Sequence, residues 1–263
     1  MPARRPRFPA VTSRRASRSV ALVLSCEHGG NRIPPRWGKL FRGQEAALLT
    51  HRGHDIGAAR VAALVAKELG APLFVARTSR LLVDLNRSLH HPRVFSDVTR
   101  ALPEEERERI VREHYTPHRR VVEDAITAAL RRSRSVVHVA VHSFTPILEG
   151  EVRRADVGLL YDPSRERERA LCAEWRARLA SAAPACVVRC NYPYRGTADG
   201  FTTALRKVHS PSRYAGVELE MNQARLGSLR DEARMAHLLA ATLADALGRE
   251  RSDVRAATRD GAT

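Results

Sequence analysis

The segment ALVLSCEHGGNRIPP, residues 21–35, contains the transition that decides the fold. Its first four residues, Ala21 to Leu24, form a short apolar run of the kind found in buried strands, and we expect a strand over residues 21–25. The run stops at Cys26, Glu27 and His28, and Gly29 and Gly30 follow at once. In open α/β sheets, ligand sites lie beyond the carboxyl ends of the strands. The segment therefore predicts a buried strand that ends at a functional site.

Outside this segment, apolar runs alternate with amphipathic segments. The predicted further strands are residues 72–79, 136–144, 156–162, 185–191 and 215–223. The predicted helices are residues 56–69, 104–132 with a break near Pro117, 165–180 and 230–247. Alternation of strands and helices with connections of this length predicts an α/β domain with a largely parallel sheet.

The chain shows no internal repeat and no Pro/Gly/Ser-rich linker, so we expect one domain at residues 20–248. Residues 1–19 are predicted to form a disordered basic tail, and residues 249–263 a polar tail. A membrane span needs about 18 or more apolar residues, and no such run occurs. The basic N-terminal segment is not followed by the apolar stretch of a secretory signal, so we expect a cytoplasmic protein.

The formal net charge of +16 raises the alternative of a noncatalytic protein that binds nucleic acid or an acidic partner. Six arginines and no acid lie within residues 1–19, so about +10 belongs to residues 20–263, where basic and acidic residues are interleaved. Aromatic residues make up only 5%, which leaves few platforms for stacking bases. We therefore favour solvated helix faces over nucleic-acid binding. The four cysteines contain no CxxC pair and are interpreted as small buried hydrophobic residues.

Two imidazoles are expected to follow strands at the same edge of the sheet. In VVHVAVHSF, residues 136–144, the alternation of a strand places His138 and His142 on one face. With His28 at the end of another strand, two histidines could bind one metal ion. Catalytic zinc usually takes three protein ligands. The candidates for the third lie in HRGHDIG: His51, His54 and Asp55, of which Asp55 could equally be a helix N-cap.

Two further segments place charged groups beside apolar residues. SRLLVDLNR, residues 79–87, includes arginines that could bind a substrate carboxylate, although a structural ion pair between Asp84 and Arg87 would explain the same pattern. In GVELEMNQ, residues 216–223, strand alternation puts Glu218 and Glu220 on one face. A partly desolvated glutamate has a raised pKa and can act as a general base. The alternative is an edge strand with its polar face in solvent.

Taken in order along residues 20–245, seven segments resemble the N-formylglutamate amidohydrolase family. They are SCEHGGNRIP, HDIGAARVAALVAKELGAP, SRLLVDLNR, VHVAVHSFTP, DVGLLYD, NYPYRGTADGFTTAL and GVELEMNQ. The resemblance implies a three-layer α/β/α fold with a central mixed, mostly parallel sheet, like that of zinc carboxypeptidases and aspartoacylase. It also implies hydrolysis of a small-molecule N-acyl amino acid, typically N-formyl-L-glutamate to formate and glutamate, late in histidine degradation.

By this resemblance, His28, Asp55 and His142 would bind one zinc ion. The carboxypeptidase pattern has a glutamate three residues after the first histidine, and here that position is Asn31. An asparagine is a poor zinc ligand, so Asp55 is preferred as the third. Glu27 should diverge from His28 and have at most a supporting role.

The resemblance also assigns the remaining site residues. Glu220 would be the general base, with Glu218 in reserve. Asn86 and Arg87 would bind the substrate carboxylate, and the further candidates for this pocket are Arg80, Tyr194 and Arg195. Two alternatives remain open: another N-acyl amino acid as substrate, and a zinc peptidase or peptidoglycan-type amidase with an open cleft.

Overall fold

The computed structural model describes residues 20–248. The two predicted tails, residues 1–19 and 249–263, lie outside the described residues, and the domain boundaries stay predictions. None of the helices within residues 20–248 is long and apolar enough to cross a lipid bilayer.

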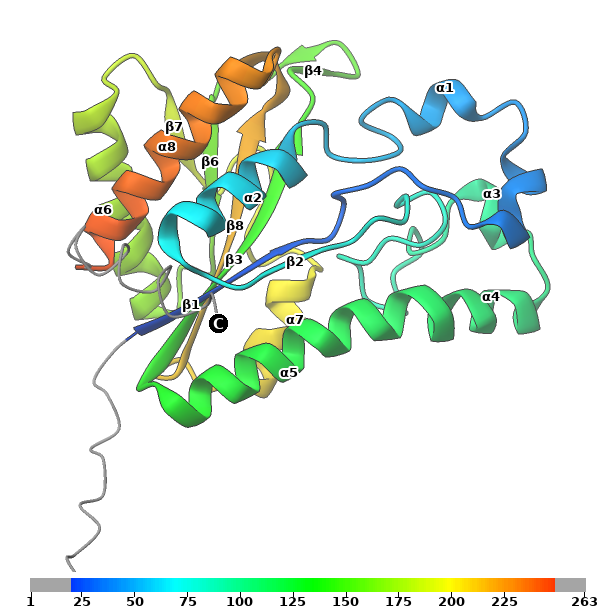
Figure 1. Cartoon of the computed structure of the whole chain (residues 1–263), viewed down its shortest axis with the longest axis horizontal. Helices are drawn as coiled ribbons and strands as arrows, with labels where there is room; N and C mark the ends of the chain where they lie inside the picture. Colours follow the sequence, from blue (N-terminus) through cyan, green and yellow to red (C-terminus); the bar gives the residue numbers. More distant parts are fainter. Residues whose placement is uncertain (1–19, 249–263) are drawn as a thin grey trace, which may run out of the picture.

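A six-stranded sheet in the order β2-β1-β3-β8-β6-β7 forms the centre of the molecule (Figure 1). Its strands are β1 (Val20–Cys26), β2 (Leu73–Val75), β3 (Ser135–Phe144), β6 (Val157–Leu160), β7 (Val188–Cys190) and β8 (Tyr214–Asn222). Strands β2, β1, β3 and β8 are parallel, whereas β6 pairs with β8 in antiparallel orientation and with β7 in parallel. The prediction of a mixed, mostly parallel sheet is confirmed.

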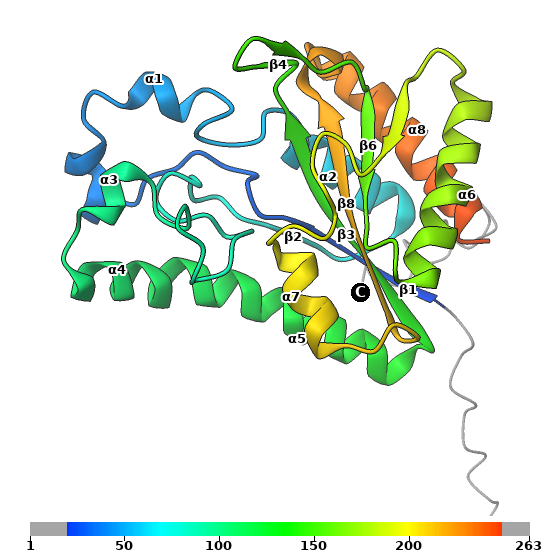
Figure 2. The same cartoon turned by 180° about the vertical axis from the view of Figure 1, so that it is seen from behind.

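Helices cover both faces of this sheet, as Figures 1 and 2 show from opposite sides. The helices that pack on the sheet are α2 (Ala58–Leu69), α5 (Thr116–Arg132), α6 (Glu166–Ala182), α7 (Phe201–Val208) and α8 (Leu229–Ala246). Side chains of α2, α6 and α8 share the main hydrophobic core with one face, and α5 and α7 pack in a smaller cluster on the other. The predicted three-layer α/β/α architecture is confirmed.

The alternation of side chains along the strands decides which face carries the polar groups. In β3, Val137, Val139 and Val141 belong to the core beneath α2, α6 and α8, so His138 and His142 lie on the opposite face. Strand β8 follows the same rule, with its apolar residues in that core. Because β8 is a central strand and all its residues are buried, the edge-strand alternative for its glutamates is wrong.

A second group of short elements lies beyond the end of the sheet (Figure 1). It comprises η1 (Pro35–Phe41), α1 (Glu45–Leu48), α3 (Asp97–Arg100), α4 (Glu104–Ile110) and the small hairpin of β4 (Ile147–Leu148) and β5 (Glu151–Val152). Much of this group is held by its own core, which includes Trp37, Phe41, Leu82 and Ile110. The carboxyl ends of the parallel strands therefore face other protein instead of bulk solvent.

Two elements of the structure differ from the sequence-based prediction. The strand predicted at residues 72–79 is regular only at Leu73–Val75, because the following residues bond irregularly to the turn after β1. The break predicted near Pro117 is instead a π turn, η2 (Val111–Tyr115), that joins α4 to α5. Pro117 lies just after this π turn, and the helix continues past it as α5. Helix α7 and the β4–β5 hairpin were not predicted.

Candidate active site

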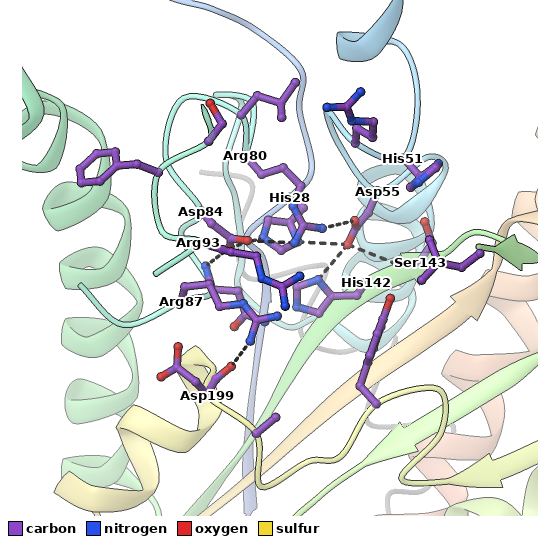
Figure 3. A pocket seen from close by; sticks show the side chains of 18 of the residues that line it. His28, His51, Asp55, Arg80, Asp84, Arg87, Arg93, His142, Ser143 and Asp199 are labelled. Atoms are coloured by element: carbon purple, nitrogen blue, oxygen red, sulfur yellow. Dashed lines mark hydrogen bonds and ion pairs between the residues drawn. The ribbon is translucent and has the colours of Figure 1, made fainter. Parts of the chain in front are cut away.

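Three side chains from different parts of the chain converge at the carboxyl end of the parallel strands (Figure 3). His28 follows β1, Asp55 precedes α2, and His142 lies near the end of β3. One ligand atom of each lies within 4.8 Å of those of the other two. The three residues are only 3%, 4% and 2% exposed. Residues that lie far apart in the sequence therefore form one buried cluster.

The two imidazoles of this cluster both turn Nδ1 toward Asp55. The Nδ1 atoms of His142 and His28 lie 2.9 Å and 3.4 Å from the same oxygen, Asp55 Oδ2. Their Nε2 atoms point to other carboxylates: His28 Nε2 lies 2.7 Å from Asp84 Oδ1, and His142 Nε2 lies 3.4 Å from Glu27 Oε2. Histidines that bind metal are typically held in this way, with the second ring nitrogen donating to a carboxylate.

The backbone around His28 explains why two glycines follow it. A Cβ at Gly30 would lie 2.2–2.6 Å from backbone atoms of Arg77, so the turn passes directly against the chain that leaves β2. The His28 carbonyl accepts a hydrogen bond from the Asp55 amide at 2.9 Å. Asp55 does not cap α2, because the N-cap residue of that helix is Gly57. The capping alternative for Asp55 is therefore wrong.

The residues present fit a divalent metal ion. His28 Nδ1 is buried and has no hydrogen-bond partner among residues 20–248. Burial of a polar atom is unfavourable unless a hydrogen-bond partner or a metal ion binds it. Two imidazole nitrogens and a carboxylate oxygen are also the donor set that catalytic zinc uses.

Charge around the cluster is balanced by Arg80. Its guanidinium contacts Asp84 at 2.9 Å and Asp55 at 3.4 Å. Burial opposes the ionisation of both carboxyl groups. The charges and hydrogen bonds of His28 and His142 nevertheless hold the pKa of Asp55 below its usual value, and Arg80 and His28 do the same for Asp84. The alternative ion pair between Asp84 and Arg87 does not form; Asp84 pairs with Arg80 and His28.

The two glutamates of β8 lie beside the cluster but in different environments. Glu220 is paired in register with His142, and Glu218 with Ala140. Glu218 Oε1 accepts a hydrogen bond from Thr202 at 2.7 Å, whereas Glu220 Oε2 is buried without a partner among the described residues. Burial, with a further contribution from the charges of Asp55 and Glu218, raises the pKa of Glu220 to about 8. A carboxyl group perturbed in this way, beside a cavity, is a candidate for proton transfer.

A cavity of about 530 Å³ opens onto this cluster, and the candidate substrate residues line it. Asn86 Oδ1 accepts a bond from the Phe201 amide at 2.8 Å, and Arg87 donates to the Asp199 carbonyl at 2.8 Å. These bonds fix both side chains from α7 and the loop before it. The remaining candidates, Arg80, Tyr194 and Arg195, also line the cavity.

Sequence reasoning did not assign three further residues near the site. Asp84 was interpreted as a structural ion-pair residue, although its place in the DLNR segment was a usable signal. Arg93 points into the cavity (Figure 3), and no acid pairs with it within residues 20–248. His118 on α5 lies 3.6 Å from Glu27. Neither Arg93 nor His118 belongs to a segment that stood out in the sequence.

Comparisons with solved structures found proteins that share this fold. A gene product from Agrobacterium tumefaciens has a solved structure with a TM-score of 0.73 and 28% identity, over 89% of this chain and 92% of that chain. N-formylglutamate amidohydrolase from Ralstonia eutropha JMP134, at 18% identity and a TM-score of 0.60 over 90% and 94% of the two chains, shares the fold.

A search of the curated proteins found no match. The sequence profile of N-formylglutamate amidohydrolase matches residues 20–226, most of the chain. The chain therefore belongs to the N-formylglutamate amidohydrolase family and is a hydrolase that acts on amide bonds.

Proposed function

We propose that this protein is a zinc-dependent amidohydrolase that cleaves the amide of an N-acyl amino acid, with N-formyl-L-glutamate yielding formate and glutamate. One observation carries the proposal: the orientation of His28 and His142, whose Nδ1 atoms face the same Asp55 oxygen. A metal ion bound by these three residues would polarise the acyl oxygen and lower the pKa of water.

Glu220 is the residue best placed to move protons. Its oxygen Oε2 is buried beside the cluster and has no hydrogen-bond partner within residues 20–248. A cation bound next to it would lower its raised pKa, so the carboxylate could take a proton near neutral pH. Glu220 takes a proton from water as the oxygen–carbon bond forms, and gives it to the amine as the carbon–nitrogen bond breaks.

The cavity lining supports an anionic substrate. Arg87 and Asn86 are already fixed by backbone groups, so they can bind the α-carboxylate with little loss of side-chain freedom. Arg93 and Arg195 line the same cavity without an acidic partner in the described part of the chain. A second carboxylate on the substrate, such as the side chain of glutamate, would provide the negative charge that these arginines lack.

Other features of the proposal rest on the resemblance and the N-terminal sequence. A place in histidine degradation, a cytoplasmic location and binding of one zinc ion stay predictions. A cavity of this size also leaves space for larger acyl groups, so a zinc peptidase or amidase activity is the alternative to test. The nucleic-acid alternative accounts for none of the buried cluster.

The test is amine release from N-formyl-L-glutamate by the purified, zinc-loaded protein. We expect release that stops after chelation and returns when zinc is added. N-acetyl-L-glutamate, N-formyl-L-glutamine and a muropeptide serve as comparison substrates. Release from the muropeptide alone would replace the proposed substrate with that of an amidase. Zinc-loaded protein that releases amine from none of these would contradict the proposed function.

A further inference from the structure

Glu27 is a buried carboxylate for which the catalytic proposal has no use. Its side chain has no exposed surface, and neither carboxylate oxygen has a hydrogen-bond partner among residues 20–248. Burying a charge without hydrogen bonds is unfavourable, because the group loses its hydration and gains nothing in return. An unsatisfied carboxylate in the centre of a fold therefore needs an explanation.

Two imidazole nitrogens lie on either side of this carboxylate. His142 Nε2 is 3.4 Å from Glu27 Oε2, and His118 Nε2 is 3.6 Å from Glu27 Oε1. Both distances are slightly too long for a hydrogen bond. The His142 nitrogen also has no hydrogen-bond partner of its own within the described chain. Glu27 is thus placed to accept from both rings but is not fully engaged by either.

The elements that carry these residues converge from three directions. Glu27 directly follows β1, His142 belongs to the neighbouring strand β3, and His118 comes from α5 just after the π turn. Such a turn changes which side of a helix faces its neighbour, and π turns are frequent at functional sites. Here the turn precedes the first turn of α5, from which His118 contacts Glu27 across the sheet face.

We propose that Glu27 is a positioning residue that holds His142 with Nδ1 toward the metal, and that His118 supports Glu27 from the other side. This rests on the proposed function, because it requires a metal at His142. It parallels the contact between Asp84 and His28 Nε2, so each metal-binding histidine has its own carboxylate. Partners of this kind typically change metal affinity 10–100-fold.

The proposal distinguishes a positioning role from a structural one. A structural carboxylate stabilises the metal-free fold, so its replacement lowers the melting temperature. A positioning carboxylate instead changes metal affinity, because it holds a ring nitrogen of the ligand toward the metal. Replacing Glu27 with glutamine should therefore weaken zinc binding, whereas replacing a buried carboxylate with a purely structural role should not.

The experiment compares the full-length wild type with Glu27→Gln, His118→Gln and Asp156→Asn. Zinc affinity is measured by competition with a chromophoric chelator, and the melting temperature is measured after metal removal. Asp156 is a buried carboxylate that bonds Val187 and Arg225 away from the site, so it is the matched control. We expect Glu27→Gln to bind zinc about 10–100-fold more weakly than the wild type, a loss that Asp156→Asn should not show.

His118→Gln should bind zinc with an affinity between those of the wild type and Glu27→Gln, and Asp156→Asn should lose thermal stability but keep its zinc affinity. Tight zinc binding by both the wild type and Glu27→Gln would overturn this inference and leave the proposed function standing. A wild type that binds no zinc would contradict the proposed function itself. A lower melting temperature for Glu27→Gln, with zinc affinity retained, would make Glu27 a structural residue.

Discussion

Asp84 shows how one residue can determine the orientation of another at this site. It accepts from His28 Nε2 and from the Asn86 amide with the same oxygen, and it pairs with Arg80 through the other. The histidine, the backbone at Asn86 and the balancing cation are therefore linked through a single carboxylate. The sequence offered a structural ion pair with Arg87 as one explanation for Asp84, whereas the structure pairs Asp84 with His28 and Arg80.

The division of roles between the site residues can be tested at Glu220 and His142. His142→Ala should lose both zinc and activity, because it removes one proposed ligand. Glu220→Gln should keep the metal, while kcat falls by about 10²–10⁴-fold, the usual effect of losing a general base. Metal content by atomic spectroscopy and steady-state kinetics measure the two effects. A Glu220→Gln enzyme with near-normal turnover would transfer the role to Glu218.

Substrate charge can be tested at Arg93. Arg93→Gln should lower kcat/KM for N-formyl-L-glutamate by about 10–100-fold, the value of a charged hydrogen bond of about 1.5–3 kcal/mol. The change should be small for N-formyl-L-glutamine, whose side chain has no charge. Arg120→Gln, on the exposed surface of α5, is the control. Equal losses for both substrates would mean that Arg93 does not bind the side-chain carboxylate.

At the scale of elements, the turn after β1 is the tightest connection near the site. It brings His28 against the segment before α2 and the chain after β2, through the bond from the Asp55 amide and a bond from Arg32 N to the Arg77 carbonyl. Close approach of backbone to backbone requires glycine at this point. The geometry of the ligands thus depends on a residue with no side chain.

Gly30→Ala should therefore lower the free energy of unfolding by about 2–4 kcal/mol, in the range of severe packing substitutions. Its Cβ would collide with backbone atoms of Arg77, which cannot move without breaking the bond to Arg32. Urea titration measures the effect. Gly38→Ala is the matched control, because a Cβ there meets nothing within 4 Å. Similar stabilities of the two variants would show that the turn can relax.

At the scale of the whole molecule, the sheet has one apolar face and one face that carries a polar network. On the polar face, His138 bonds the Ser25 hydroxyl at 2.7 Å and the Tyr214 hydroxyl at 2.9 Å. Burial is the main cause that lowers the pKa of His138 from 6.5 to about 4. Folding therefore keeps this imidazole neutral at pH values where the unfolded chain would protonate it.

This shift predicts a stability that depends on pH. Between pH 6.5 and about 4 the unfolded state binds more protons at this residue, so stability falls as the pH falls through that window. Between pH 7 and pH 5 the contribution is about 2 kcal/mol. Between these two pH values, the free energy of unfolding of the metal-free wild type should fall by about 2 kcal/mol more than that of His138→Gln. Urea titration at both pH values measures the difference. Equal losses would show that His138 is not kept neutral.

Local sequence determined most of the elements of this fold. The apolar runs predicted β1, β3, β6 and β8, because a buried strand needs apolar residues on the face that packs on helices. Period-two alternation also predicted that Glu218 and Glu220 share a face. The segments that match the family identified the candidate residues of the cluster, although their roles stay proposals. In each case, the signal lies within a few neighbouring residues.

Only the tertiary structure decided how these residues combine. The antiparallel direction of β6, the approach of Asp55 to both histidines, and the placement of Arg93 and His118 arise from contacts between distant segments. No local pattern encodes them, since a side chain's environment depends on whatever packs against it. The different environments of Glu218 and Glu220 show this most directly: the two have the same spacing and face, but only Glu218 receives a hydrogen bond from α7.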